Sequence, residues 1–278
     1  MGRSLGRPFG VALAAAAMLL AGCGAAKGPA ATAPSGPSAT AGGNLAIPAG
    51  TTAQAQLSAL KGCKPTPQPG GQEYWLVTAG TGNPKYALPK ATPKVGTSLG
   101  GWPTTPMVVL GDCQNTEAWV YAAGDSKNFY LAVQVDSTLS VVAGTATSPW
   151  TGDCLQFAFD PLDQLTSGSY GPNDDESGMI LLNGQPFLFQ NVQAGAAITP
   201  IAIPGGQASI TRNNGITLYE AAIPWASINS PVNPTFGFNI AVAAGGPPYQ
   251  APNWGYEWTQ GIIEAKSPAD FAQLTFKP

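Results

Sequence analysis

The sequence predicts an all-β protein built as an antiparallel β-sandwich, and three observations support this fold class. Short stretches of alternating apolar and polar residues recur from about residue 100 onward. Glycine (35 residues) and proline (27 residues) interrupt these stretches, and only 10% of the chain is charged. No long stretch has a convincing helical period. A turn-rich β architecture with a Thr, Ser, Asn and Gln surface fits this composition.

The N-terminus has the organisation of a secretion signal. Arg3 and Arg7 precede a short apolar run at 11–20, which is too short to span a bilayer comfortably. The run ends in Leu20-Ala-Gly-Cys23, which closely resembles the lipobox of bacterial lipoproteins. The resemblance implies removal of residues 1–22 and acylation of Cys23 at both its sulfur and its new amino group. Such a multiply acylated cysteine would anchor the chain stably to a membrane.

The mature chain then divides into three predicted parts. Residues 23–43 consist mainly of Gly, Ala, Pro, Ser and Thr and are expected to form a flexible tether. Residues 44–100 contain a modest helical signal at 51–60 and an apolar burst at 74–77, and are predicted to pack on the main domain as an extension. Residues 101–278 are long enough for one sandwich domain.

Composition excludes several classes of function. The chain contains no histidine, which excludes Ser-His and Cys-His catalysis and His-ligated zinc or haem. Without Arg3 and Arg7, 10 basic residues face 15 acidic ones, and no basic cluster follows Cys23. Nucleic acid is therefore excluded as a partner, since phosphate binding needs concentrated Lys and Arg.

Three cysteines remain besides Cys23 in what should be an oxidising compartment. Because three is odd, at most one intramolecular disulfide can form and one thiol is left over. Sequence does not fix the pairing among Cys63, Cys113 and Cys154. A Cys63–Cys113 pair is the first guess, since both lie in turn-like settings, and the third cysteine would be a buried small residue.

The strand pattern is clearest at Cys154–Asp160. Leu155, Phe157 and Phe159 fall on one face at period two and are predicted to enter the core, whereas Gln156, Ala158 and Asp160 fall on the other. Asn214-Gly215 predicts a two-residue hairpin turn, and residues 124–128 predict another turn. The further candidate strands are 119–123, 129–135, 179–182, 186–190, 208–212, 216–223, 236–242 and 272–276.

A series of motifs occurs in a fixed order along the domain. They are Gly101-Trp102, Phe129-Tyr-Leu-Ala-Val-Gln-Val-Asp136, Trp150-Thr-Gly-Asp-Cys-Leu-Gln-Phe-Ala-Phe-Asp160, Tyr170-Gly-Pro-Asn-Asp-Asp175, Gly215-Ile-Thr-Leu-Tyr-Glu-Ala-Ala-Ile-Pro-Trp225, Phe236-Gly-Phe-Asn-Ile240 and the segment 254–276. This ordered set resembles the family 9 carbohydrate-binding modules over about two-thirds of the mature chain. The resemblance implies a jelly-roll-like sandwich and sugar binding without catalysis.

The resemblance also suggests the residues of a binding site. Trp150 matches the tryptophan that stacks on sugar in binding members, and Trp254 or Trp258 would supply the second platform. Gln156 and Asn239 would hydrogen-bond to sugar hydroxyls. Family binders carry a glutamate where this chain has Gln156, so one charge-assisted hydrogen bond is lost. Either the ligand differs or the site no longer binds sugar.

Carboxylates allow other interpretations. Asp174, Asp175 and Glu176 concentrate oxygen ligands in one loop, which fits a structural Ca²⁺ or, as the alternative, a solvated acidic turn. Glu220 is predicted to be a structural acid, hydrogen-bonded or paired with Arg212. No two carboxylates are marked as a glycosidase pair, so no catalytic residue is assigned.

These observations lead to one expectation of function and one alternative. The chain is expected to be a lipoprotein that faces the cell exterior or the periplasm and binds a mono- or oligosaccharide. The alternative is a structural or protein-interaction lipoprotein of the envelope whose sandwich no longer binds sugar. Haem, which related sandwiches can hold, would need Met107 or Met179 with a lysine as axial ligands, a rare arrangement.

Overall fold

The computed structural model describes residues 66–67, 73–76, 83–111, 117–136, 144–149, 152–165, 168–229, 234–245, 252–263 and 266–277. All of them belong to the second of two compact units, Ala39–Pro278. The signal peptide, Cys23, the tether, the helical signal at 51–60, Cys63 and Cys113 lie outside the described residues. The predictions made for these segments are therefore left as predictions.

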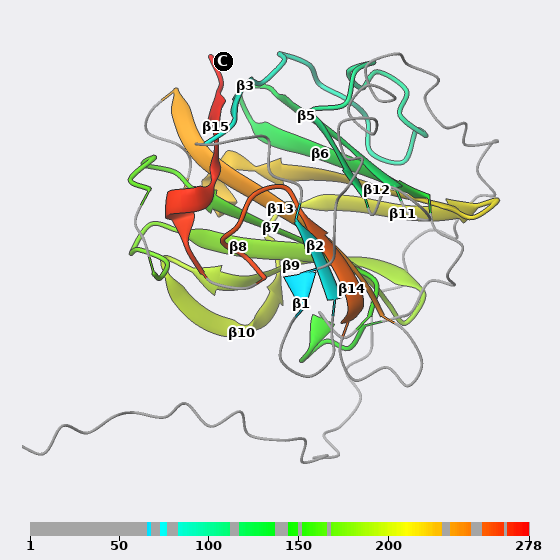
Figure 1. Cartoon of the computed structure of the whole chain (residues 1–278). Coiled ribbons are helices and arrows are strands. Elements are labelled where there is room, and N and C mark those ends of the chain that lie inside the picture. Colours follow the sequence, from blue (N-terminus) through cyan, green and yellow to red (C-terminus); the bar gives the residue numbers. More distant parts are fainter. Residues whose placement is uncertain are drawn as a thin grey trace, which may run out of the picture. The chain divides into compact units, whose positions relative to one another are not determined.

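The larger of the two sheets holds ten of the described strands (Figure 1). Its main path runs β1-β2-β14-β13-β7-β8-β9-β10, and β15 joins β13 to β3. The pairings are antiparallel except β14 with β2 and β15 with β3. The strands are β1 (Thr66–Pro67), β2 (Glu73–Leu76), β3 (Lys85–Ala87), β7 (Cys154–Asp160), β8 (Asp175–Leu182), β9 (Gln185–Gln193), β10 (Ala196–Ala202), β13 (Thr235–Gly245), β14 (Pro252–Glu257) and β15 (Ala272–Thr275).

The second sheet has five described strands in the order β11-β12-β6-β5-β4, all antiparallel. The strands are β4 (Val108–Gly111), β5 (Glu117–Gly124), β6 (Asn128–Asp136), β11 (Gln207–Asn213) and β12 (Ile216–Pro224). The helical turns η2 (Trp225–Ser227) and η3 (Pro268–Asp270) are single 3₁₀ turns. Within the described residues no helix is long and apolar enough to cross a membrane. The predicted all-β sandwich is confirmed.

Most predicted strands are found within a few residues of their expected bounds. The Asn214-Gly215 turn joins β11 to β12, with φ values of 50° and 82° that suit these two residue types. β8 begins at Asp175, four residues before the predicted start. Its first two residues, Asp175 and Glu176, are buried acids, which the apolar pattern did not include in the strand. β4, β10 and β14 were not predicted.

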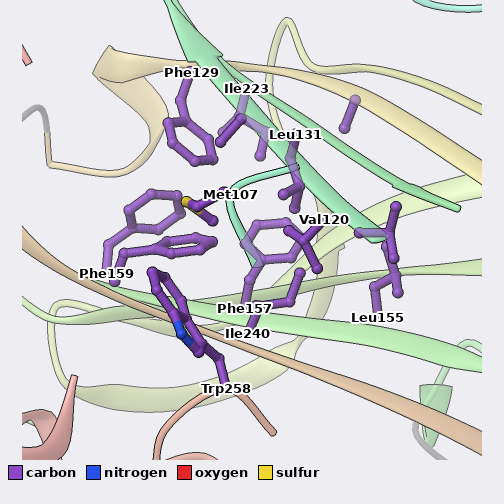
Figure 2. Packing of buried hydrophobic residues seen from close by; sticks show 14 of the residues in the cluster. Met107, Val120, Phe129, Leu131, Leu155, Phe157, Phe159, Ile223, Ile240 and Trp258 are labelled. Atoms are coloured by element: carbon purple, nitrogen blue, oxygen red, sulfur yellow. The ribbon is translucent and has the colours of Figure 1, made fainter. Parts of the chain in front are cut away.

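The core lies between the two sheets and is rich in aromatic residues (Figure 2). As predicted, Leu155, Phe157 and Phe159 of β7 are buried there. Phe129 from the five-stranded sheet meets Phe159 edge to face, with ring centroids 5.2 Å apart. Such pairs add about 0.5–1.5 kcal/mol beyond the burial of their area. Phe238 of β13 contacts both rings and completes the centre of the core.

Glu220 has a structural role on the outer face of the five-stranded sheet. Its carboxylate accepts hydrogen bonds from the backbone N–H groups of Gly96 (2.8 Å) and Leu99 (3.2 Å). Arg212 pairs in register with Thr217 and donates to its hydroxyl at 2.6 Å. Because residues 217 and 220 are three apart on one strand, they point to opposite faces. The suggested Arg212–Glu220 pair is wrong, and the structural role of Glu220 is confirmed.

Replacing Phe157 by alanine should lower the free energy of unfolding by about 3–5 kcal/mol, because it leaves a cavity in a packed core. The adjacent Gln156→Ala variant is the matched control and should change that free energy by less than about 1 kcal/mol, since Gln156 points away from the core. Denaturant unfolding of both variants measures the difference. Equal losses would contradict the two-faced assignment of β7.

Candidate functional site

Gln156 lies on the outer face of the ten-stranded sheet, the face turned away from the core. Its backbone pairs with Gly178 of β8 and with Ala241 of β13. Gln156 is half-buried, whereas the other residues of β7 are buried. Both neighbours are themselves covered, since a methyl group added at Gly178 would lie 2.5 Å from the Phe189 ring and Ala241 packs with Ile262 and Phe271. The amide of Gln156 can donate and accept hydrogen bonds where it reaches the surface. We call Gln156, Gly178 and Ala241 the Gln156 strip.

The register brings the two segments with predicted platform tryptophans to the same end of the ten-stranded sheet, with Trp254 at a position of the opposite face, because it pairs with Ala244. Cys154, the first residue of β7, pairs with Ala243 of β13, and Ala243 pairs with Gly255 of β14. Trp254 directly precedes Gly255, and Trp150 precedes Cys154 by four residues. Trp150 and the side chain of Trp254 lie outside what the structure describes, so their stacking role stays a prediction.

The segment that leads to Trp150 lies over the same face. A methyl group added at Gly144 would come within 3.0 Å of the Cδ1 atom of Ile180, which pairs with Cys154. Pro149 is buried as well. Residues 144–149 therefore cover the sheet on one side of the Gln156 strip.

Trp258 does not face a ligand. It is 3% exposed and packs in the core against Phe238, with ring centroids 6.5 Å apart. Its backbone N–H donates to the carbonyl of Ile240 at 3.0 Å, which holds the residue beside β13. The burial contradicts the predicted platform role of Trp258, because stacking on a sugar requires an accessible ring face.

Asn239 is fully buried and holds the segment after β14. Its Oδ1 accepts from the backbone N–H of Thr259 at 3.1 Å, and its Nδ2 donates to the carbonyl of Thr259 at 2.9 Å and to Glu257 at 2.8 Å. The amide thus has protein partners at both ends. The predicted contact between Asn239 and a sugar hydroxyl is contradicted, and the alternative of pairing with a neighbouring loop is observed.

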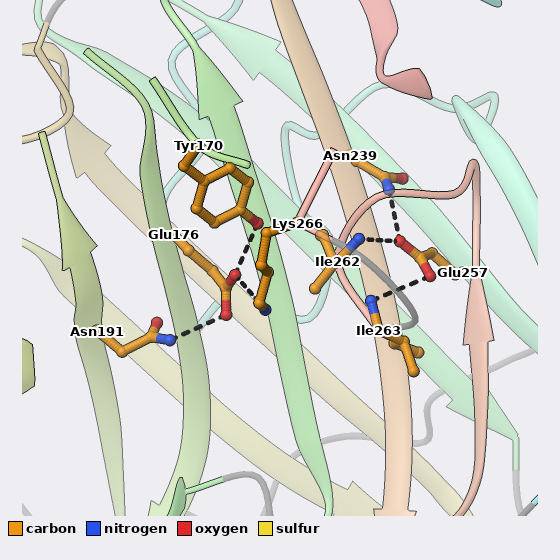
Figure 3. Close-up of polar contacts among 8 residues, drawn as sticks. All are labelled: Tyr170, Glu176, Asn191, Asn239, Glu257, Ile262, Ile263 and Lys266. Atoms are coloured by element: carbon orange, nitrogen blue, oxygen red, sulfur yellow. Dashed lines mark hydrogen bonds and ion pairs between the residues drawn. The ribbon is translucent and has the colours of Figure 1, made fainter. Parts of the chain in front are cut away.

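Glu257 holds the next part of the same segment, and sequence reasoning missed it. Its Oε1 accepts from the Ile262 N–H at 2.5 Å and its Oε2 from the Ile263 N–H at 3.2 Å (Figure 3). The side chain is 3% exposed, and this burial raises the pKa of Glu257 to about 8 despite its hydrogen bonds. Ile262 and Phe271 pack on the sheet there. Residues 259–263 and 266–271 therefore cover the other side of the Gln156 strip.

Glu176 forms a third group of polar contacts on this face, after those of Asn239 and Glu257 (Figure 3). Its buried carboxylate accepts hydrogen bonds from Tyr170 (2.6 Å) and Asn191 (2.9 Å) and forms an ion pair with Lys266 at 2.5 Å. The Lys266 side chain is 45% exposed, so its ammonium group remains partly hydrated. The contact joins β8, β9 and the covering segment.

Asp174, Asp175 and Glu176 do not form the predicted calcium site. Asp175 and Glu176 alternate in β8 and face opposite sides of the sheet, and each has protein donors of its own. Asp174 accepts from the Gly171 N–H at 2.5 Å. In the described part of the chain, no three such side chains are arranged to hold a metal ion. The alternative of a solvated turn is also wrong, because all three residues are buried.

Asp174 also lies beside a second buried acid. Desolvation raises the pKa of Asp174 to about 6, and the nearby negative charge of Asp160 adds to the rise. Desolvation likewise raises the pKa of Asp175 to about 6. Cys154, the described cysteine of the sandwich, is a free and buried thiol. Asp160, Asp174, Asp175 and Cys154 are thus all buried within the packed sandwich.

The chain is similar in fold to several solved structures. One is a family 9 carbohydrate-binding module from Caldicellulosiruptor kristjanssonii in complex with cellotriose, which has 16% sequence identity and a TM-score of 0.50, with 69% of this chain and 93% of that chain covered. Another is a putative carbohydrate-binding protein from Bacteroides uniformis, with 14% identity, a TM-score of 0.50 and coverage of 70% and 100%.

Comparison at the level of sequence gives no further match. No family model matches the chain, and no curated protein matches it either. The similarity to the solved structures therefore concerns the fold, which agrees with the fold expected from the ordered motifs.

One sequence signal could have revealed the burial of Trp258. Tyr256 and Trp258 are two residues apart, and an extended chain places such residues on one face. Tyr256 is 1% exposed, and both rings enter the core. The signal was hidden because the Pro- and Gly-rich run before Trp254 masks the start of β14.

We predict that the protein loses stability as pH rises from about 4.5 to about 8. Glu257 keeps its proton in the folded state up to a pKa of about 8, whereas its ordinary value is 4.5. The folded state therefore binds more protons in this window, and each rise in pH favours unfolding. Asp174 and Asp175 act in the same direction up to about pH 6.

The Glu257→Gln variant should flatten the upper half of this dependence, between about pH 6 and pH 8. Gln260→Ala, an exposed position of the same segment, is the control and should keep the parent slope. Melting temperatures recorded across the pH range measure both. Equal slopes for Glu257→Gln and the parent would contradict the assignment.

Proposed function

We propose that this chain binds a neutral carbohydrate, without catalysis, at the end of the outer face where β7, β13 and β14 meet. The observation that carries the proposal is the shared register of Cys154, Ala243 and Gly255. It brings the segment before β7 and the start of β14 to one end of the sheet. Trp254 pairs with Ala244, which assigns it to the face of Tyr256 and not to that of Gln156, so the proposed platform is Trp150. The half-buried amide of Gln156 lies on the outer face.

The chemistry of sugars supports this assignment. A pyranose presents C–H faces that pack on aromatic rings and hydroxyls that pair with amides. Trp150 would stack on the ring, and Gln156 would hydrogen-bond to its rim. The shared fold with carbohydrate-binding proteins, one of them a complex with cellotriose, supports the same class of ligand.

The buried carboxylates support binding without catalysis. A glycosidase needs two acids held about 5–9.5 Å apart and free to reach the scissile bond. Glu176 and Glu257 are instead engaged by donors of the protein itself. Their place in the fold is structural, and we infer no hydrolytic role for them.

Lipid anchoring completes the proposal. The Leu20-Ala-Gly-Cys23 sequence would place acyl chains on Cys23, and residues 23–43 would separate the sandwich from the membrane. The chain would then act at the outside of a bacterial membrane, facing the exterior or the periplasm. A surface-bound sugar receptor follows from these two parts together.

The second candidate function is a structural or protein-interaction lipoprotein of the envelope. It is favoured by the use of Asn239 and Trp258 within the fold, since two of the five expected ligand contacts are then lost. It is also favoured by Gln156. Its amide makes weaker hydrogen bonds than the glutamate carboxylate that sugar-binding members of the similar family carry at this position.

Titration of the tryptophan fluorescence with glucose, cellobiose, xylose and cell-wall sugars tests the binding proposal. At least one sugar should change the emission and raise the melting temperature. Trp150→Ala should abolish the response, and Gln156→Ala should weaken it roughly 3- to 10-fold. Ile201→Ala, an exposed residue of β10, is the control. An absence of response to every sugar would favour the envelope role.

The lipid anchor has its own test. The full-length protein should partition with the membrane fraction and the Cys23→Ala protein with the soluble fraction, because two or more acyl chains are needed for stable anchoring. Mass spectrometry of the mature N-terminus measures the modification directly. A Cys23→Ala protein that still partitions with membranes would contradict lipidation.

A further inference from the structure

Two buried carboxyl groups meet at the last residue of β7. Asp160 ends β7 and is fully buried, and Asp174 directly precedes β8 and is 2% exposed. Their side chains lie in hydrogen-bonding contact with each other. Cys154 begins β7 and Asp160 ends it, so the pair is at the other end of the strand from the proposed sugar site. The contact joins the loop that follows β7 to the loop that precedes β8.

The hydrogen bonds of this pair leave one acceptor open. The backbone N–H of Leu165 donates to Oδ2 of Asp160 at 2.8 Å, and that of Gly171 donates to Oδ2 of Asp174 at 2.5 Å. In the described part of the chain, no group donates to the buried Oδ1 of Asp160. A buried carboxylate oxygen without a donor is costly. A proton on Asp174 would supply the missing donor.

A third acid lies on the side of Asp160. Desolvation raises the pKa of Asp163, the hydrogen bond from Gln273 lowers it, and the negative charge of Asp160 raises it again. The charge of Lys85 in β3 acts on Asp163 and lowers its pKa. Among the described residues, Lys85 forms no ion pair with Asp160 or Asp174. The pair therefore has no cation of its own on this side.

The side of Asp174 offers no compensating charge either. Asp175 adds a negative charge, and its own carboxylate is occupied by Gln190 and by the backbone N–H of Ala194. The Tyr170 hydroxyl donates to Glu176. Two ionised carboxylates would repel each other in such a site, and a single proton between them removes the repulsion.

We propose that Asp160 and Asp174 share one proton and so form a pH-sensitive contact between their two loops, closed in acid and opened near neutral pH. The closed contact holds Asp174 against the turn between β9 and β10, where the Gly195 N–H donates to the Asp174 carbonyl at 2.8 Å. A methyl group added at Gly195 would lie 2.2 Å from the Gly171 carbonyl oxygen, so loop and turn pack closely. Opening separates them and hydrates Asp174.

Closure should weaken as pH rises. In the closed state desolvation and the charge of Asp160 raise the pKa of Asp174 to about 6, whereas in a hydrated loop it would have its ordinary value of 3.8. The closed state thus binds more protons between these values, and its advantage is full below pH 3.8 and lost as pH rises through about 6. The difference corresponds to a change of about 100-fold in the equilibrium between closed and open loops.

Hydrogen exchange of the full chain between about pH 4 and about pH 8, followed by mass spectrometry, tests the proposal. After correction for the intrinsic rate, peptides that contain Leu165, Gly171 and Gly195 should lose protection by up to about 100-fold as pH rises. Asp174→Asn places an amide donor where the proton would be, so it should keep the acid protection at every pH. Asp270→Asn, which changes an exposed acid, is the matched control and should behave as the parent does.

NMR titration of the aspartate Cγ signals in the parent protein is the second measurement, and it needs no variant. Asp174 should titrate near pH 6, and the Asp160 signal should shift in the same range because the two carboxyls are coupled. Titration of Asp174 below about pH 5 would overturn the proposal. So would an Asp174→Asn protein whose Gly171 loses protection with pH as the parent does. If that variant does not fold, the titration of the parent decides.

Discussion

The register of β7 within the ten-stranded sheet is the constraint on which the rest of the structure depends. It turns Phe157 into the core and Gln156 to the outer face, and a slip of one residue would exchange the two. Edge-to-face packing between Phe159 and Phe129 of the opposite sheet makes such a slip costly. The same register sets Cys154 level with Gly255 and so decides which loops can meet.

Buried polar groups then divide the outer face. Asn239, Glu257 and Glu176 bind Thr259, Ile262 and Lys266 of the covering segment to the sheet through backbone and side-chain hydrogen bonds. Such groups are costly to bury unless every partner is present, so they hold the covering segment in one position. Glu176 and Glu257, the acids that could have acted in catalysis, instead hold this segment on the sheet. Of the Gln156 strip, Gln156 itself remains half-buried, while Gly178 and Ala241 are buried.

The candidate site was only partly predictable from the sequence. The period-two pattern gave Gln156 an outward direction, which needs nothing beyond strand geometry. Asn239 and Trp258 were expected at a sugar and are used within the fold, because their partners Thr259 and Phe238 come from separate positions in the chain.

The sequence by itself determined the all-β class, most strands, the Asn214-Gly215 turn and the inward face of β7, since all of these follow from local periodicity and turn chemistry. Only the tertiary structure decided the roles of the polar residues. Lys266 reaches Glu176 across 90 positions of sequence, and no local pattern encodes that distance. Burial raises the pKa of Glu257 for the same reason, because the groups that exclude water from it are brought there by folding.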